Sequence, residues 1–326
     1  MTVLVTGATG YIGHALALHL ASLGWHVRAL CRSQANGLSA VANIEVVRGC
    51  LSDTYALKAA LTKCDQLYHL AAFARVWSRD PSAYYSLNVD ATCRLLALAA
   101  EQGVRKMVFT SSAGVFGPSE RQRMVREEDV RTVPFFNDYE RSKYQAEEAC
   151  RSFARQGLHV VIVNPSRVYG SGIDTPSNAI SRLIKLYASG KWPFIPGDGK
   201  SVGNYAYLSD VVRGHVLAME KGRPGERYIL GGENCSYEHF FTLLRELSGI
   251  RRKLYHLPLG ALLAFSRVEE WKANLFNVAP LITPQWVKKY LFDWALDCTK
   301  AKDELGYEIT PLRVGLSKTI NDILGE

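Results

Sequence analysis

The first half of the chain alternates short apolar segments rich in β-branched residues with longer amphipathic segments. The apolar segments predict strands, and the amphipathic segments between them predict helices. The predicted strands are Val3–Thr6, Val27–Cys31, Ile44–Arg48, Gln66–Ala71, Lys106–Ser111 and Val160–Asn164, and the predicted helices are Ile12–Leu23, Tyr55–Leu61, Ala83–Glu101 and Tyr139–Gln156. This alternation is typical of an α/β doubly wound parallel sheet, the Rossmann architecture, which binds its ligands beyond the carboxyl ends of the strands.

The pattern changes after Asn164–Gly170, where glycine, proline and serine interrupt the chain and the alternation fades. We therefore predict two portions with different tasks. A dinucleotide-binding Rossmann domain is expected over residues 1–167 plus about 205–232. A smaller C-terminal α/β substrate-binding portion is expected over residues 168–204 plus about 233–326.

The net charge of +8 permits an anionic partner, but the basic residues are spread along the chain without a basic run. This favours attraction of a phosphorylated cofactor over binding of nucleic acid. The seven cysteines contain no C-x-x-C pair and the histidines no H-E-x-x-H, so we expect neither a disulfide framework nor a metal site. The N-terminal residues form a strand pattern without signal-peptide features, and the apolar stretch Leu257–Phe265 is too short to span a bilayer, which predicts a cytoplasmic protein without a membrane span.

A glycine-rich turn follows the first predicted strand and leads into the first predicted helix. Gly7 permits the tight turn, Gly10 allows the backbone to approach a pyrophosphate, and Gly13 allows the helix to pack closely on the strand. The helix N-terminus supplies amide donors and the positive end of the helix dipole. A glycine turn in this position predicts a dinucleotide site.

The residues after the second and third strands bear on which dinucleotide binds. No acidic residue follows the second strand, while Arg32 and Ser33 stand at its carboxyl end and could hold a 2′-phosphate, which predicts NADP(H), with NAD(H) possible. Asp53 follows the third strand and either accepts from the adenine amino group or caps the next helix. The small residues around Leu70, Ala71 and Ala72 would let a cofactor lie flat against the backbone.

Candidate chemistry appears at Tyr139 and Lys143, which share a helix face because they are four residues apart. If this face lines a pocket, the Lys143 ammonium is expected to lower the pKa of the Tyr139 hydroxyl and make it a proton donor or acceptor nearer neutral pH. Ser112 ends the fifth strand, and its hydroxyl is expected to face the same crevice.

Taken in order, these motifs resemble the extended short-chain dehydrogenase/reductase family. They are Gly7-x-x-Gly10-x-x-Gly13, Asn88-Val89-Asp90-Ala91-Thr92, Thr110-Ser111-Ser112 and Tyr139-x-x-x-Lys143. The resemblance implies that Ser112 holds the substrate oxygen, that Tyr139 transfers the proton, and that Lys143 also binds the nicotinamide ribose. It further implies cofactor contacts at Thr9, Tyr11, Ile12, Asn88, Pro165 and Val168, although Asn88 could instead only fix the local backbone, and Ala91 replaces the family's glycine.

The second half bears on the substrate. In nucleotide-sugar enzymes of this family an Arg-Asp pair contacts the substrate diphosphate, and here Gly203-Asn204 occupy its place, which argues against such a substrate unless Lys200 or Arg182 substitutes. The pattern at Val27–Arg32 and the ending Asp303–Tyr307 resemble dihydroflavonol reductase-like and hydroxysteroid dehydrogenase-like branches, and Phe73–Trp77 resembles hopanoid-associated sugar epimerases. An apolar pocket or the core could contain Phe73, Trp77, Phe135, Phe136, Tyr169 and Trp192. The polar loop 118–137 either covers the site or is a solvated insertion.

The leading hypothesis is an NADP(H)-dependent enzyme that interconverts a ketone and a secondary alcohol on a small, largely non-nucleotide substrate. The alternatives are an epimerase or dehydratase of sugars or nucleotide sugars that retains its NAD(P), and a non-catalytic nucleotide-sensing scaffold. By resemblance, the helices Ala83–Glu101 and Tyr139–Gln156 are expected to form a homodimer interface.

Overall fold

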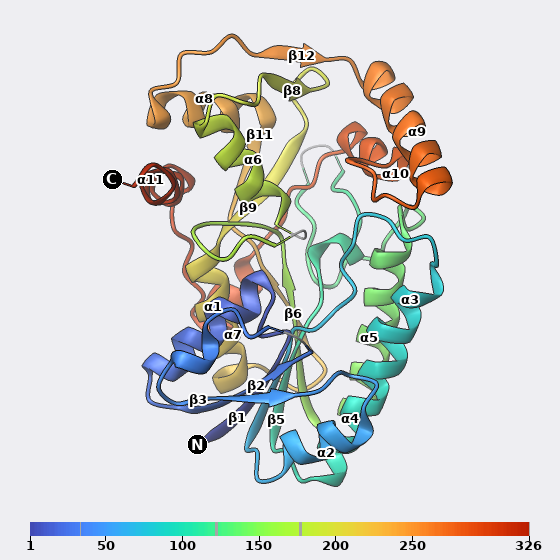
Figure 1. Ribbon diagram of the computed structural model, residues 1–326, viewed down its shortest axis with the longest axis vertical. Helices are drawn as coiled ribbons and strands as arrows, with labels where there is room; N and C mark the ends of the chain where they lie inside the picture. The colour runs from blue at the N-terminus through green and yellow to red at the C-terminus, as the bar shows by residue number, and fades with distance from the viewer. Residues whose placement is uncertain (33, 121–122, 176–177, 326) are drawn as a thin grey trace.

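The computed structural model of the chain describes residues 1–32, 34–120, 123–175 and 178–325 (Figure 1). Its main sheet has seven parallel strands in the order β10-β6-β5-β4-β1-β2-β3. These strands are β1 (Thr2–Thr6), β2 (His26–Cys31), β3 (Ile44–Arg48), β4 (Gln66–His69), β5 (Lys106–Thr110), β6 (His159–Pro165) and β10 (Arg227–Leu230). The predicted doubly wound parallel sheet is confirmed, and each predicted strand is present with small shifts at its ends.

The strand order places a topological switch between β1 and β4. From β1 the chain builds outward through β2 and β3, then crosses to β4 on the other side of β1 and continues through β5 and β6. The connections after β1 and β4 therefore leave the sheet in opposite directions. A crevice is expected at the carboxyl ends of these two strands.

Helices cover both faces of this sheet, because successive strand residues point to opposite sides. On one face α1 (Tyr11–Ser22) and α7 (Leu208–Lys221) pack on residues such as Val3 and Val5. On the other face α2 (Thr54–Leu61), α4 (Ala91–Glu101) and α5 (Asp138–Arg155) pack on residues such as Leu4 and Leu67. These strand residues are fully buried, so the sheet has an apolar core on each side.

The single helix expected over Ala83–Glu101 is divided. A short α3 (Ser82–Tyr85) leads into a π-helical segment, Ser86–Asp90, before α4 begins. Single π-helical turns are often found at functional sites. The segment contains Asn88, which is buried and bonded across to α5.

Two smaller sheets form the other end of the molecule. One has the order β11-β9-β7, and in the other β12 pairs with β8. Their strands are β7 (Arg167–Tyr169), β8 (Phe194–Pro196), β9 (Val202–Tyr207), β11 (Glu233–Ser236) and β12 (Tyr255–Leu257). A third apolar core joins them to α6 (Ala179–Ala188), α8 (Tyr237–Ser248) and α11 (Leu312–Leu324).

The returning segment expected at about 205–232 divides between the two ends. β9 lies in the smaller sheet, whereas α7 and β10 belong to the main sheet and its helical layer. The remaining helices are α9 (Leu259–Phe276) and α10 (Pro284–Lys288), with short turns at Leu38–Ala40, Ala113–Val115, Lys289–Leu291 and Ala301–Leu305. In Figure 1, α9 and α10 lie above α3 and α5, at the end away from the main sheet. The domain boundaries stay a prediction.

All seven cysteines are free thiols. Within the described ranges, no helix is both long and apolar enough to cross a membrane. No group of three or more His, Cys, Asp or Glu side chains in that part of the chain could hold a metal ion.

Candidate active site

The glycine turn after β1 forms a tight, close-packed approach to α1. Gly7 has a φ of +74°, and its carbonyl accepts from the Gly10 amide at 2.8 Å. A Cβ atom at Gly7 would overlap the backbone of Leu70 and Ala71, and one at Gly13 would overlap Gly7. Since no side chain caps the N-terminus of α1 and its first turn contains no acidic residue, this end of the helix suits an anion.

Residues at this turn and the neighbouring strand ends lie around the crevice at the switch. Thr9 and Ile12 are partly buried beside Gly10, and the Ala71 amide donates to Thr6 Oγ1 at 3.3 Å after β4. Tyr11 differs, because its hydroxyl donates to the Gly170 carbonyl at 2.7 Å and ties α1 to the segment after β7. A cofactor contact at Tyr11 would therefore use its backbone amide. Also near these strand ends are Leu70 and Ala72 after β4, Pro165 at the end of β6 and Val168 on β7.

Arg32 and Arg28 have different surroundings. Arg32 is exposed at the carboxyl end of β2, while Ser33 lies outside the described residues. Arg28 donates to Glu45 at 2.9 Å and to the Ala60 carbonyl at 3.2 Å, so it is held as part of the fold. The exposed Arg32 is therefore accessible to a phosphate at this edge, as is the exposed Arg48 at the end of the neighbouring strand β3.

Asp53 caps α2. Its Oδ1 accepts from the Ala56 amide at 3.0 Å, and the residue is exposed. Of the two alternatives that the sequence left open, the structure contains the helix cap. A contact between Asp53 and an adenine stays a prediction.

Ser112 and Tyr139 come together from β5 and α5. The Ser112 Oγ accepts from Gly114 at 3.2 Å, and Asn137 caps α5 by accepting from Glu140 at 2.9 Å, which fixes Tyr139 in the first turn. Both side chains are partly exposed. Burial raises the pKa of Tyr139 to about 12, the adjacent Glu140 also raises it, and a hydrogen bond with the Ser112 side chain lowers it.

Lys143 occupies a different position from the one expected. Its Nζ lies over the Phe109 ring, 4.1 Å from the centroid, and the residue is 1% exposed. Burial lowers the pKa of Lys143 to about 8. The expectation that Lys143 lowers the pKa of Tyr139 is therefore wrong for this structure: burial dominates at both residues, and Lys143 is directed toward β5.

Asn88 supports this arrangement from the π-helical segment. Its Oδ1 accepts from the Phe73 amide at 2.7 Å, and its Nδ2 donates to Ser142 Oγ at 2.9 Å. Ser142 in turn donates to the Tyr139 carbonyl at 2.9 Å. Asn88 therefore fixes local backbone on both sides, and a direct cofactor contact stays a prediction.

A buried ion cluster surrounds Glu140, next to Tyr139, and no motif in the sequence indicates it. Glu140 accepts from Arg131 at 3.0 Å and from Lys289 at 2.6 Å. Arg131 also donates to the Gly114 carbonyl at 2.6 Å, in the turn after Ser112. Because Lys289 is distant in sequence, only the fold could identify this cluster, which joins the elements of Ser112 and Tyr139 to the C-terminal third.

The loop 118–137 is packed rather than freely solvated, in the part that the structure describes. Ser119 forms a β-bridge with Asp293, Val125 forms another with Leu296, and the Glu127 carboxylate accepts from the Ile229 amide at 2.7 Å. The loop therefore covers the carboxyl end of β10 and meets the C-terminal segment.

The aromatic candidates divide between core and edge positions. Tyr169 is fully buried and packs on Tyr207, so it belongs to the core. Phe136 packs on Phe292 and Trp294, where the loop meets the C-terminal segment. The others are partly buried or exposed and pack as Phe73 on Tyr84, Phe135 on Tyr144 and Trp192 on Phe194, while Trp77 is partly buried.

Arg167 is a second residue that the sequence analysis missed. Its guanidinium lies 5.7 Å from the Tyr205 ring centroid and 5.2 Å from that of Tyr237. Burial raises the pKa of the Tyr205 and Tyr237 phenols, and their hydrogen bonds with the Arg167 side chain lower it. A Cβ atom at Gly203 would overlap Nη1, so Arg167 fills the space beside Gly203 on the neighbouring strand.

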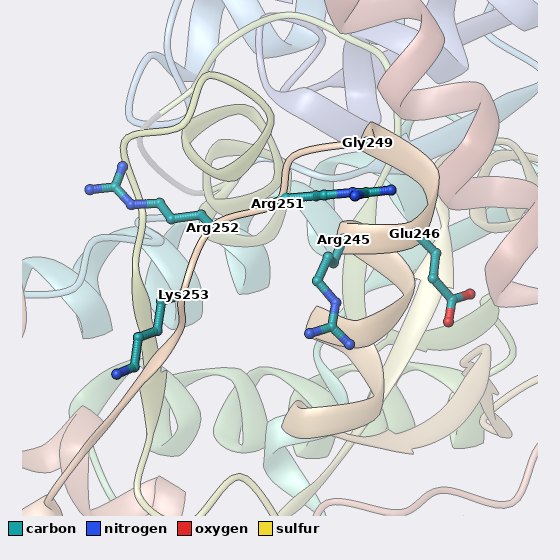
Figure 2. Close-up of a pocket in the computed structure, with 6 residues that line it drawn as sticks. All are labelled: Arg245, Glu246, Gly249, Arg251, Arg252 and Lys253. Carbon is teal, nitrogen blue, oxygen red and sulfur yellow. The ribbon is translucent and has the colours of Figure 1, made fainter.

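The hollow in Figure 2 is separate from these residues. It is formed by the C-terminal end of α8 and the following segment, and its lining is mostly basic, with Arg245, Glu246, Gly249, Arg251, Arg252 and Lys253. None of the predicted site residues belongs to it.

Comparison with known proteins points to one family. A model of the NAD dependent epimerase/dehydratase family matches residues 3–231. Sterol demethylase protein B of Methylococcus capsulatus is 36% identical over 79% of this chain and 78% of its own, and a 4-hydroxy-2-methyl-3-oxo-4-farnesyl-3,4-dihydroquinoline-1-oxide ketoreductase of Stigmatella aurantiaca is 29% identical over 94% and 92%. The solved structure of UDP-glucose 4-epimerase from Thermotoga maritima with UDP-glucose superposes with a TM-score of 0.82 at 26% identity, over 100% of this chain and 99% of that one.

Proposed function

Because the chain belongs to the NAD-dependent epimerase/dehydratase family, we propose that it is an NADP(H)-dependent oxidoreductase that interconverts a ketone and a secondary alcohol. Its substrate is small, largely non-nucleotide, and apolar or moderately polar. The observation that carries this proposal is the approach of the Ser112 and Tyr139 side chains, both partly exposed, at the carboxyl edge of the main sheet. The relatives support it, since the Stigmatella protein is named a ketoreductase of a farnesylated quinoline and the Methylococcus protein a sterol demethylase component.

The cofactor fits the residues present. Gly7, Gly10, Gly13 and the uncapped start of α1 would hold the pyrophosphate, and the exposed Arg32 would hold a 2′-phosphate. The family resemblance assigns the nicotinamide ribose to Lys143, whose buried ammonium, 4.1 Å from the Phe109 ring centroid, would have to turn toward the crevice to reach it. A bound nicotinamide supplies or accepts the hydride.

Side chains of the protein supply or accept the proton. With a pKa of about 12, Tyr139 is protonated at neutral pH and suits proton donation to the substrate oxygen during reduction. Ser112 would donate a hydrogen bond to the same oxygen and hold it in place.

A reductase assay tests this function. Purified protein is mixed with NADPH or NADH and a panel of aromatic and alicyclic ketones, and the rate of cofactor oxidation is measured at each ketone concentration. NADPH-dependent turnover is expected, and Tyr139→Phe should reduce kcat at least about 100-fold, because the proton donor is lost. Tyr85→Phe is the matched control, since Tyr85 lies on α3 and donates to Asp138 at 2.7 Å. Unchanged turnover in Tyr139→Phe would contradict the assignment.

The second candidate is an epimerase or dehydratase that retains its NAD(P) and acts on a nucleotide sugar. Gly203-Asn204 argued against it, but the Arg167 guanidinium lies directly beside Gly203 and close to the rings of Tyr205 and Tyr237. Arg167 could therefore supply the cation for a diphosphate that β9 lacks, whereas Lys200 and Arg182 are exposed.

Ligand-induced stabilisation separates the two candidates. If the second is correct, the protein copurifies with NAD(P), UDP-glucose or GDP-mannose raises its Tm, and Arg167→Gln removes that shift. Arg313→Gln, at an exposed ion pair with Glu246, is the control. A null Tm shift together with ketone turnover favours the first candidate. Cofactor binding without any turnover would favour a non-catalytic nucleotide-sensing scaffold.

A homodimer is part of the proposal by family resemblance alone. It would use the outer faces of α4 and α5. Light scattering of the purified protein should give twice the chain mass, and a monomeric mass would contradict it.

A further inference from the structure

The helix α9 exposes large apolar residues that a helix packed on a protein core would bury. Only Ser266 and Ala273 are buried along its length, and it packs on α10. By contrast, Val268 is 50% exposed, Trp271 64% and Leu275 60%. A helix of a globular protein normally buries such residues.

Helix geometry places these residues on one outward stripe. Ser266 and Ala273 are seven residues apart and mark the side that faces the protein. At roughly 100° per residue, Val268, Trp271 and Leu275 fall on nearly the opposite side, and Phe265 lies about 90° around the helix from them. The stripe continues past the helix end, so we define the apolar face of α9 as Phe265, Val268, Trp271, Leu275, Phe276, Val278 and Leu281, all exposed.

Positive charge accompanies the apolar face. Arg267 and Lys272 are exposed at its two edges by the same geometry, whereas the two acidic residues of α9, Glu269 and Glu270, are partly buried on the sides nearer the protein, and Glu269 accepts from Lys272 at 3.1 Å. Arg251, Arg252 and Lys253 are exposed on the segment that leads through β12 into α9 (Figure 2). In Figure 1, β12 and α9 follow one another at the same end of the molecule.

We propose that the apolar face of α9 binds the surface of a bilayer that contains anionic lipids. An outward apolar stripe with a tryptophan, edged by long cationic side chains, is the pattern of helices that lie in the membrane interface. The basic segment 251–253 adds attraction to anionic headgroups. A second copy of the chain is the alternative occupant of this face, and the vesicle experiment includes the outcome that identifies it.

Docking would place the candidate active site close to the bilayer. α9 packs on α10, which leads directly into Lys289, and Lys289 contacts Glu140 beside Tyr139. An apolar ketone dissolved in the bilayer would then enter from the membrane side. This consequence rests on the proposed function, whereas the binding itself does not.

Vesicle flotation tests the binding without any need for turnover. The full-length protein is mixed with vesicles of phosphatidylcholine alone or with vesicles that also contain about 30% phosphatidylglycerol, an anionic lipid that gives the surface a negative potential. The fraction of protein that floats with the vesicles is measured. Binding to the anionic vesicles is expected, with a decrease at high salt because exposed charges are screened. Trp271→Ser with Leu275→Ser should weaken it about tenfold or more, since two large apolar side chains no longer enter the interface.

The controls separate the face from the rest of the surface. Tyr55→Ser removes an 85% exposed aromatic side chain from α2 and should bind as the wild type does. A triple change of Arg251, Arg252 and Lys253 to Gln should reduce binding to anionic vesicles only. Thermal unfolding and reduction of a water-soluble ketone should be unchanged in all variants.

Three outcomes would overturn the proposal. They are no binding of the wild-type protein to anionic vesicles, equal binding by the Trp271→Ser and Leu275→Ser double variant, or a lipid-free dimer that this double variant converts to monomers. If vesicles bind as expected but no ketone is reduced, the membrane face stands and the proposed reductase function fails.

Discussion

At the scale of single residues, burial sets the chemistry of the candidate site more than sequence spacing does. Tyr139 and Lys143 have the spacing of a catalytic pair, yet each has its pKa moved by burial first, upward to about 12 for the phenol and downward to about 8 for the ammonium. The Ser112 side chain is the group that lowers the pKa of Tyr139. Spacing identified the residues, but their protonation depends on neighbours distant in sequence.

The lowered pKa of Lys143 predicts how the free energy of unfolding depends on pH. The charged form is disfavoured in the folded state, which costs about 3 kcal/mol below pH 8 if the pKa falls from 10.5 to about 8. The unfolded chain binds more protons between these values, so stability should rise with pH there. Lys143→Met should therefore raise the free energy of unfolding at pH 7, by about 1–3 kcal/mol after loss of packing is counted.

Urea unfolding at several pH values measures this effect. The difference between Lys143→Met and wild type should shrink as pH rises from 8 toward 10.5, because the wild-type lysine becomes neutral in both states. Lys318→Met, at an exposed position on α11, should show no such trend. A constant difference across this pH range would contradict the assignment, and turnover should fall in Lys143→Met whatever its stability.

At the scale of elements, the π-helical segment is the irregular feature that positions the site. It interrupts a helix that amphipathicity alone predicts as continuous, and it directs Asn88 between the Phe73 backbone and α5. The glycine turn works in the same local way, since only residues without a Cβ permit its close approach to Leu70 and Ala71. The turn was predictable because a strand, three glycines and a helix follow one another in the sequence. The π-helical segment was not, because it depends on contacts of Asn88 with residues distant in the chain.

Asn88→Ala tests this positioning role. It leaves the buried Phe73 amide without its acceptor and removes a donor to Ser142, so the free energy of unfolding should fall by about 2–4 kcal/mol. A lower kcat with little change in KM for the ketone is expected, because α5 carries Tyr139. Asn321→Ala, exposed on α11, should change neither quantity. Stability like that of wild type would contradict the role.

At the scale of the whole molecule, the C-terminal third completes a site whose predicted catalytic residues all come from the first half. Lys289 reaches Glu140 from the end of α10, and its ammonium also lies 4.6 Å from the Trp286 ring centroid and 4.4 Å from that of Trp294. Arg131 joins the same carboxylate to the turn after Ser112. The two ends of the molecule therefore share a buried ion cluster beside Tyr139.

A double-mutant cycle tests this connection. Lys289→Met should destabilise the fold by about 2–4 kcal/mol, because one partner of a buried ion pair is lost, although Arg131 still partners Glu140. Combined with Glu140→Gln, the two changes should show a coupling free energy of about 1 kcal/mol or more, measured by urea unfolding. Additive effects would contradict direct coupling. Arg313→Met with Glu246→Gln, an exposed pair, provides the comparison.

The sequence by itself determined six of the seven strands of the main sheet within small shifts, the glycine turn and the family, because strand alternation, turn chemistry and helix spacing are local patterns. It also predicted that the Ser112 hydroxyl faces the same crevice as Tyr139, because ligands of a parallel sheet bind beyond the carboxyl ends of its strands. Only the tertiary structure decided where Lys143 points, that Asp53 caps α2, that Arg167 stands beside Gly203, and that Lys289 meets Glu140. Three of these contacts join residues far apart in the chain, whereas Asp53 accepts from Ala56 only three residues away, where the local pattern fits both a cap and a ligand contact. The electrostatics of the distant contacts depend on burial, which no local pattern contains.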